Sequence, residues 1–246
     1  MKKLVVALAI VTVTLGSCKK HPPSDCFKST GKITEQERDI GNFNTIILND
    51  NVNLHLSKGN ENKLSIKAGK NLIKKIVTEI KDDTCLVISN LNSCNWVRSY
   101  KPPVDVYLTF KKLFDIEYHS TGNIDNNDTL NIDSLAVNVR EGAGNIKLLV
   151  NAKRIYSNIH RGTATIEFSG NTWLLFVYSA DFGLIDNRYL NAQRVYLRSE
   201  SGNDIYVRAQ KSISATINGI GNVYYYGNPQ SVFSDGTGSG KLIHSE

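Results

Sequence analysis

The most regular feature of the chain is an alternation of apolar and polar residues that restarts about every 20 residues. The segments FDIEYHSTGNI, LAVNVREGAGNI, VYLRSESGNDI and ISATINGIGNV each run from an alternating stretch into a turn that carries Gly or Asn. Alternation with a period of two is typical of strands that bury one face. The first apolar positions of seven such units, 18 to 21 residues apart, are Phe114, Leu135, Ile155, Leu174, Val195, Ile213 and Val232.

One unit of this kind cannot bury its apolar face alone, whereas stacked units bury it together. If successive laps lie about 4.8 Å apart, their backbone N–H and C=O groups pair and their inward side chains form columns. The glycine pair Gly219 and Gly221 is then a corner of the backbone, where a tight bend favours glycine. Since parallel crossovers are almost always right-handed, the pattern predicts an all-β, single-stranded, right-handed parallel β-helix, a β-solenoid with laps of about 20 residues.

The earlier half of the chain alternates less regularly. Val52, Leu54 and Leu56 alternate with polar residues, and "PPVDVYLTF" repeats the pattern close to residue 110. We interpret residues 41–112 as wider, irregular first laps of the solenoid domain 41–246, followed by regular laps over 113–246. A separate sandwich domain is the alternative.

The N-terminus resembles a bacterial lipoprotein signal. A basic start is followed by an apolar run over residues 4–15 and by "LGSC". The run of about a dozen apolar residues is shorter than the about 20 that a spanning helix needs. We therefore predict a signal peptide over 1–17, lipid attachment at Cys18 and a polar tether over 18–40, with an ordinary signal peptide as the alternative. Lys19 follows the cysteine at the position where an acidic residue would resemble an inner-membrane retention signal, so the outer membrane is favoured. Either leaflet of that membrane is compatible with the sequence.

Charge and cysteine content limit the kinds of partner, metal and cofactor that the chain is expected to bind. The net charge is +6 and the pI is about 9.0. The basic residues are scattered beside acidic ones and the chain is predicted to be exported, so no nucleic-acid partner is expected. In an oxidising envelope Cys85 and Cys94 could form a disulfide or remain two thiols. Neither has a Cys or His two to four residues away, so we predict no metal site and no cofactor.

Several segments superficially suggest chemistry. "GTGSGKL" lacks the residues of a phosphate-binding loop, and Asp125, Asp128 and Asp133 lack the order of a calcium-binding EF-hand. Acidic and basic residues also gather near neighbouring corners, at Asp181, Asp186, Glu200, Asp204, Arg188 and Arg198. They could form the acidic site of a β-helix polysaccharide lyase or hydrolase, or simply alternate on a surface. We favour the second interpretation and predict no catalytic residues.

Aromatic residues give the best indication of binding. If Ile205 and Val223 point inward, then Tyr206, Tyr224 and Tyr226 point outward and can stack on consecutive laps. High β-propensity alone is the alternative explanation. The same scheme places Trp173, Leu175 and Val177 outward, as an apolar patch suited to self-association.

The order of segments FNTIIL, VNLHL, KLSIKAGKNL and IVTEIKDDTCLVI, followed by laps such as INGIGNV, resembles the putative auto-transporter adhesin head GIN-domain family over most of residues 40–245. The resemblance implies an envelope lipoprotein of Bacteroidetes-like bacteria, with a β-helix-like fold and no established catalytic residues. We therefore expect a noncatalytic outer-membrane lipoprotein, adhesin-like or scaffolding, that displays a lateral surface to a glycan or an envelope protein. A polysaccharide lyase or hydrolase is the alternative, and homo-oligomerisation stays open.

Overall fold

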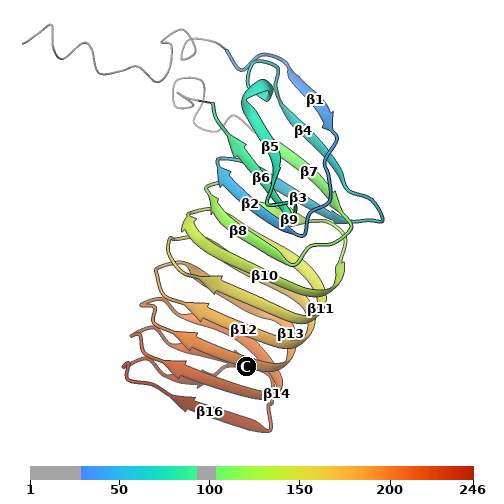
Figure 1. The fold of residues 1–246 in the computed structure, drawn as a ribbon. Coiled ribbons are helices and arrows are strands. Elements are labelled where there is room, and N and C mark those ends of the chain that lie inside the picture. Colours follow the sequence, from blue (N-terminus) through green and yellow to red (C-terminus); the bar gives the residue numbers. More distant parts are fainter. Residues whose placement is uncertain (1–28, 93–103) are drawn as a thin grey trace, which may run out of the picture.

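The computed structural model describes residues 29–92 and 104–246 (Figure 1). These residues form 17 strands that wind into stacked laps, and the predicted all-β parallel β-helix is confirmed. Most laps contribute one strand segment to each of two ladders, which we call ladder A and ladder B. The predicted signal peptide, Cys18 and Cys94 lie outside the described residues.

The two ladders face each other across one hydrophobic core, which runs without a break from Phe43 to Val223. Ladder A contains, in spatial order, β1 (Ile33–Arg38), β4 (Lys63–Gly69), β7 (Asp105–Phe110), β3 (Asn53–Lys58), β9 (Ile124–Asn126), the first halves of β11 (Asn145–Ile159), β12 (Thr165–Ser179), β13 (Leu184–Ser199) and β14 (Ile205–Ile217), then β15 (Val223–Tyr226) and β17 (Leu242–His244). Ladder B contains β5 (Ile76–Lys81), β6 (Cys85–Asn90), β2 (Thr45–Asp50), β8 (Asp115–Ser120), β10 (Leu130–Gly142), the second halves of β11 to β14, and β16 (Ser231–Asp235).

The parallel register builds the columns that the alternation predicts. Ile155 pairs with Leu175, Leu175 with Val195, and Val195 with Ile213, and all four side chains are buried. The prediction is wrong by one residue in β12, where Leu175, not Leu174, points inward. Residues 173–177 are all apolar, so the alternation is hidden there and the neighbouring laps decide the register.

This shift corrects part of the predicted surface. Leu175 is 0% and Val177 4% exposed, so both belong to the core and cannot form an outward patch. At the two ends of the regular laps the expected inward residues are half exposed: Phe114 is 49% exposed just before β8, and Val232 is 48% exposed on β16. Val232 still pairs with Ile213, but β16 is the last strand of ladder B.

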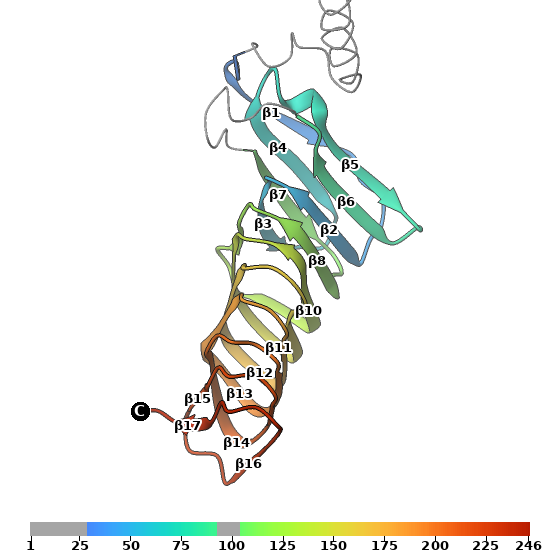
Figure 2. The ribbon, with the colours of Figure 1, turned by 90° about the vertical axis from the view of Figure 1, so that its left-hand side faces the viewer.

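The first laps end in antiparallel strands (Figure 2). β1 pairs with β4, β4 with β7, and β5 with β6, all antiparallel, and a single 3₁₀ turn (Ile73–Lys75) precedes β5. β1 lies within the predicted tether, so ordered structure begins earlier than residue 41. Arg38 on β1 donates hydrogen bonds to the carbonyl oxygens of Ile76 (2.6 Å) and Ile73 (3.1 Å), and so joins the outer strands of the two ladders.

Nowhere in residues 29–92 or 104–246 is a helix long and apolar enough to span a bilayer.

Candidate binding surface

The tyrosines predicted from the sequence do meet on ladder A. Tyr206 on β14 pairs with Tyr224 on β15, and their rings stack with centroids 5.3 Å apart and an interplanar angle of 14°. Tyr226, two residues further along β15, pairs with Arg208. The rule that strand side chains alternate in direction is enough to produce this outward strip.

The faces of Tyr206 are nevertheless occupied by the chain itself. The guanidinium carbon of Arg188 lies 4.2 Å from the ring centroid of Tyr206, while Tyr224 stacks against the same ring. Asp186 Oδ1 accepts a hydrogen bond from Arg188 Nε at 2.7 Å and raises the pKa of the guanidinium, which therefore stays charged. A cation–π stack of this kind stabilises the surface internally. Binding through the strip stays a prediction, and at Tyr206 a ligand would have to use the edge of the ring.

Trp173 lies at the corner between the ladders and is 50% exposed. Lys211 Nζ lies 4.8 Å and the Arg194 guanidinium 5.8 Å from its ring centroid. Beside it runs a ladder of amides, in which the side chains of Asn151, Asn171 and Asn191 each donate to the asparagine of the preceding lap. A shallow hollow of about 430 Å³ lies over this corner. Of the three residues predicted as an outward patch, Trp173 alone is on the surface.

Ladder B carries an aromatic column that the sequence analysis missed. Tyr156, Phe176 and Tyr196 pair in register on β11, β12 and β13. The rings of Tyr156 and Phe176 stack at 4.8 Å and 5°, and those of Phe176 and Tyr196 at 5.7 Å and 21°. The three residues are 20 positions apart, which is the period of the laps, so the repeat itself was the signal. We call these three residues the aromatic column.

A groove runs beside the aromatic column. A second outward row, two residues further along each strand, is formed by Asn158, Tyr178, Arg198 and Thr216. Between the two rows lies a hollow of about 310 Å³, whose lining includes Phe176, Tyr196, Arg198, Ser214 and Thr216. We call it the column groove. Glu200 Oε1 accepts hydrogen bonds from Arg198 Nη2 (2.6 Å) and Nε (3.0 Å), so the guanidinium is held in place at the rim.

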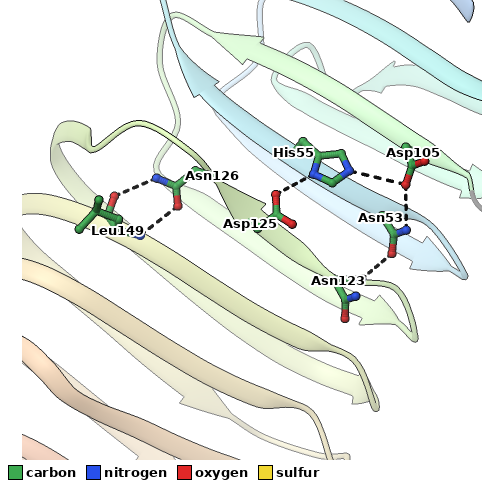
Figure 3. A network of polar contacts seen from close by, with 7 residues as sticks. All are labelled: Asn53, His55, Asp105, Asn123, Asp125, Asn126 and Leu149. Carbon is green, nitrogen blue, oxygen red and sulfur yellow. Dashed lines mark hydrogen bonds and ion pairs between the residues drawn. The ribbon is translucent and has the colours of Figure 1, made fainter.

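The cluster that most resembles an active site is on ladder A (Figure 3). His55 Nδ1 lies 2.6 Å from Asp125 Oδ1, and His55 Nε2 lies 3.6 Å from Asp105 Oδ1. Asn53 donates to Asp105 at 2.9 Å, and Tyr107 stacks on the imidazole at 4.7 Å. Both imidazole nitrogens face carboxylates of neighbouring strands, so neither is directed at a substrate. The arrangement joins β3 to β7 and β9.

The acidic residues predicted near neighbouring corners do not converge. Each is engaged separately: Asp181 accepts from the backbone N–H of Gly162, Asp186 binds Arg188, Glu200 binds Arg198, and Asp204 accepts from the backbone N–H of Asn222. Carboxylates bonded in this way support corners of the solenoid.

The remaining candidates for metal binding or thiol chemistry have the following surroundings in the structure. Asp125 binds His55, and Asp133 pairs with Lys153 at 2.7 Å. Among the described residues, no group of three or more His, Cys, Asp or Glu side chains could hold a metal ion. Cys85 is a partly exposed thiol at the start of β6, where burial raises its pKa. Its predicted pairing with Cys94 stays a prediction, because Cys94 lies outside the described residues.

Solved structures share this fold. A putative adhesin from Bacteroides fragilis NCTC 9343 superposes with a TM-score of 0.77 at 21% identity, covering 87% of this chain and 97% of that one. A putative lipid binding protein from Parabacteroides distasonis ATCC 8503 gives 0.66 at 19% identity (89% and 98% covered), and a putative adhesin from Parabacteroides merdae ATCC 43184 gives 0.65 at 18% (89% and 98%). These identities show similarity of fold alone.

Sequence comparison defines the family. No curated protein sequence matches the chain. Residues 42–229, which include most strands of both ladders, match the family described as "Putative auto-transporter adhesin, head GIN domain". The chain therefore belongs to the head GIN domain family.

Proposed function

We propose that the protein is a noncatalytic, adhesin-like lipoprotein of the outer membrane, whose solenoid presents the lateral face of ladder B to an external glycan or protein. The observation that carries the proposal is the aromatic column, a stack of three rings on an outward sheet face with Tyr196 44% exposed. Aromatic rings are the side chains that contribute most to recognition surfaces. Membership of an adhesin family supports the same function.

The binding experiment compares the two aromatic surfaces. Purified full-length protein in detergent is applied to a glycan array and to immobilised envelope proteins, alongside Phe176→Ala and Tyr224→Ala variants. We expect Phe176→Ala, which removes the ring that Tyr156 and Tyr196 stack against, to lose binding. Tyr224→Ala, the matched change on ladder A, should retain it. Loss in Tyr224→Ala alone would transfer the function to ladder A. Turnover of a pectin-like polymer that disappears in Asp181→Ala or Asp204→Ala protein would favour the lyase or hydrolase instead.

Membrane attachment is tested separately. We propose that Cys18 is acylated and that this lipid anchors the chain to the membrane. Cells grown with a clickable fatty acid should label the wild-type protein and leave Cys18→Ser unlabelled. Equal labelling of both proteins would exclude Cys18 as the attachment site.

A further inference from the structure

The aromatic column is interrupted by one small residue. In the register of ladder B, Tyr196 is followed by Ser214 on β14, and Ser214 by Phe233 on β16. Neighbouring strands lie about 4.8 Å apart, so Tyr196 and Phe233 start about 10 Å apart with a hydroxymethyl group between them. A flat ring placed over Ser214 would lie about one strand spacing from an aromatic side chain on each side. The column therefore has the geometry of a stack with one ring missing.

Within the described residues, no ring or cation lies on the face of Tyr196 toward this gap, whereas both faces of Phe176 and both faces of Tyr206 are occupied. Phe176 has a ring on each side, at 4.8 and 5.7 Å. Tyr206 on ladder A has Arg188 on one side and Tyr224 on the other. Tyr196 stacks with Phe176 on one side, and on the other it adjoins Ser214, which lines the column groove. Tyr196 and Phe233 are 44% and 56% exposed, so the two flanking rings present apolar surface to a guest.

The rim of the gap is polar and carries no net positive charge. Ser214 and Thr216 each bring a hydroxyl group into the column groove, and within the described chain no hydrogen bond engages either hydroxyl. Arg198 uses two N–H donors on Glu200, which leaves three of the five for a ligand. Glu200 balances the charge of Arg198, and Asp235 pairs with Thr216 on the next strand. With no positive excess, the groove disfavours an anionic ligand.

These features distinguish a sugar ring from an aromatic side chain of a partner protein. A pyranose presents apolar C–H groups on its faces and hydroxyl groups at its edge, which matches two flanking aromatic rings and a rim of hydroxyl and guanidinium groups. An aromatic side chain would fill the same gap but leave those polar groups without partners, which is costly when water is excluded. The hollow of about 310 Å³ lies at the lower end of the range for small-molecule sites, so it suits one or two rings.

We infer that the gap over Ser214, between Tyr196 and Phe233, is a binding site for a neutral pyranose unit of a glycan. The inference rests on the proposed function and specifies its ligand class and its position on ladder B. The sugar ring stacks on Tyr196, and its hydroxyl groups bond to Arg198, Ser214 and Thr216. The aromatic column then continues through the ligand.

The test fills the gap with a side chain. Full-length protein is titrated with the methyl glycosides of glucose, galactose, mannose and N-acetylglucosamine, and binding is followed by saturation-transfer NMR. We expect at least one glycoside to bind, Ser214→Phe to weaken it by about tenfold or more, and Tyr196→Ala to do the same. Ala136→Phe is the matched control, because Ala136 pairs with Tyr156 at the other end of the column and its ring would extend the stack without entering the gap. This control should bind as wild type does.

Each other outcome overturns the inference. Unchanged binding in both Ser214→Phe and Tyr196→Ala would exclude this site, as would the absence of binding by every glycoside. Tighter binding of methyl glucuronide than of methyl glucoside would refute the neutral ligand class. Binding of N-acetylphenylalaninamide, but of no glycoside, would assign the gap to a protein partner. If Phe176→Ala abolishes array binding while Ser214→Phe does not, the proposed function stands and the sugar site fails, so the two failures are distinguishable.

Discussion

Tyr118 is the clearest test of how the laps are held together. Tyr118 belongs to β8, its side chain is fully buried, and its hydroxyl group donates to the carbonyl oxygen of Gly122 at 2.6 Å. The phenol oxygen of Tyr118 in turn accepts a hydrogen bond from the backbone N–H of Gly144 at 3.0 Å. Gly122 and Gly144 form corresponding corners of successive laps, so one phenol oxygen satisfies a backbone group in each. A β-carbon at residue 144 would clash with that oxygen, which explains the glycine there.

Replacing Tyr118 by Phe removes one oxygen and preserves the packing of the ring. The change leaves a buried acceptor and a buried donor without their partner, at about 1 to 3 kcal/mol each, so the free energy of unfolding should fall by about 2 to 6 kcal/mol. Urea denaturation followed by circular dichroism measures it. Tyr189→Phe is the control, because Tyr189 is 70% exposed. This substitution should change the free energy of unfolding by no more than about 0.5 kcal/mol.

The pH dependence provides a second measurement on the same pair of proteins. Burial raises the pKa of Tyr118 from 10.0 to about 12. The folded state therefore favours the protonated phenol, and the stabilisation is complete below pH 10 and is lost as the pH rises to about 12. A pKa shift of two units corresponds to about 2 to 3 kcal/mol. The difference in the free energy of unfolding between wild type and Tyr118→Phe should become smaller by this amount as the pH rises. A Tyr118→Phe variant as stable as wild type, or a difference in unfolding free energy that does not change with pH, would refute the reasoning.

Three further changes test the end, the core and a corner of the solenoid. Arg38→Met removes the guanidinium that joins β1 to the β5 side, and should lower stability by about 1 to 3 kcal/mol in urea denaturation, with little salt dependence because its acceptors are uncharged. Val177→Asp places a carboxylate in the core, so it should abolish folding as judged by circular dichroism. A soluble, folded variant would contradict the buried position of Val177. Gly122→Ala brings a β-carbon against the carbonyl group of Val52 and should lower the melting temperature markedly, while Gly41→Ala, whose β-carbon would meet the Ile80 side chain at an ordinary contact distance of 3.8 Å, should change it little.

The solenoid could be predicted because its evidence is repeated in every lap. Alternating apolar residues and glycine corners fix the inward columns at Leu135, Ile155 and Ile213 without knowledge of distant contacts. The prediction failed at Leu174 and Leu175, where five apolar residues in succession carry no alternation. There the choice is made by pairing with the laps on either side, which is information that the local sequence lacks.

The functional surface was only partly predictable for a related reason. Outward direction follows from the alternation, and so Tyr206 and Tyr224 were placed correctly. Whether an outward ring has a free face depends on the long side chains around it, such as Arg188, whose position is set by Asp186. The antiparallel end of the solenoid was missed because β1 pairs with residues about 30 positions away, and its sequence does not repeat the pattern of the laps.

The geometry of stacking connects these observations. A strand spacing of about 4.8 Å is close to the separation of stacked rings, so any aromatic residue repeated at the lap period stacks on its own copies. Such rings stabilise the solenoid but offer no face to a ligand in the middle of the stack. A small residue in the column leaves a face of the neighbouring ring uncovered, and in ladder B Ser214 is a small residue with an aromatic residue on each side. The proposed site over Ser214 therefore implies that an interruption in a column decides where a ligand can stack, and that a single substitution at such a point would create or remove a site without altering the backbone.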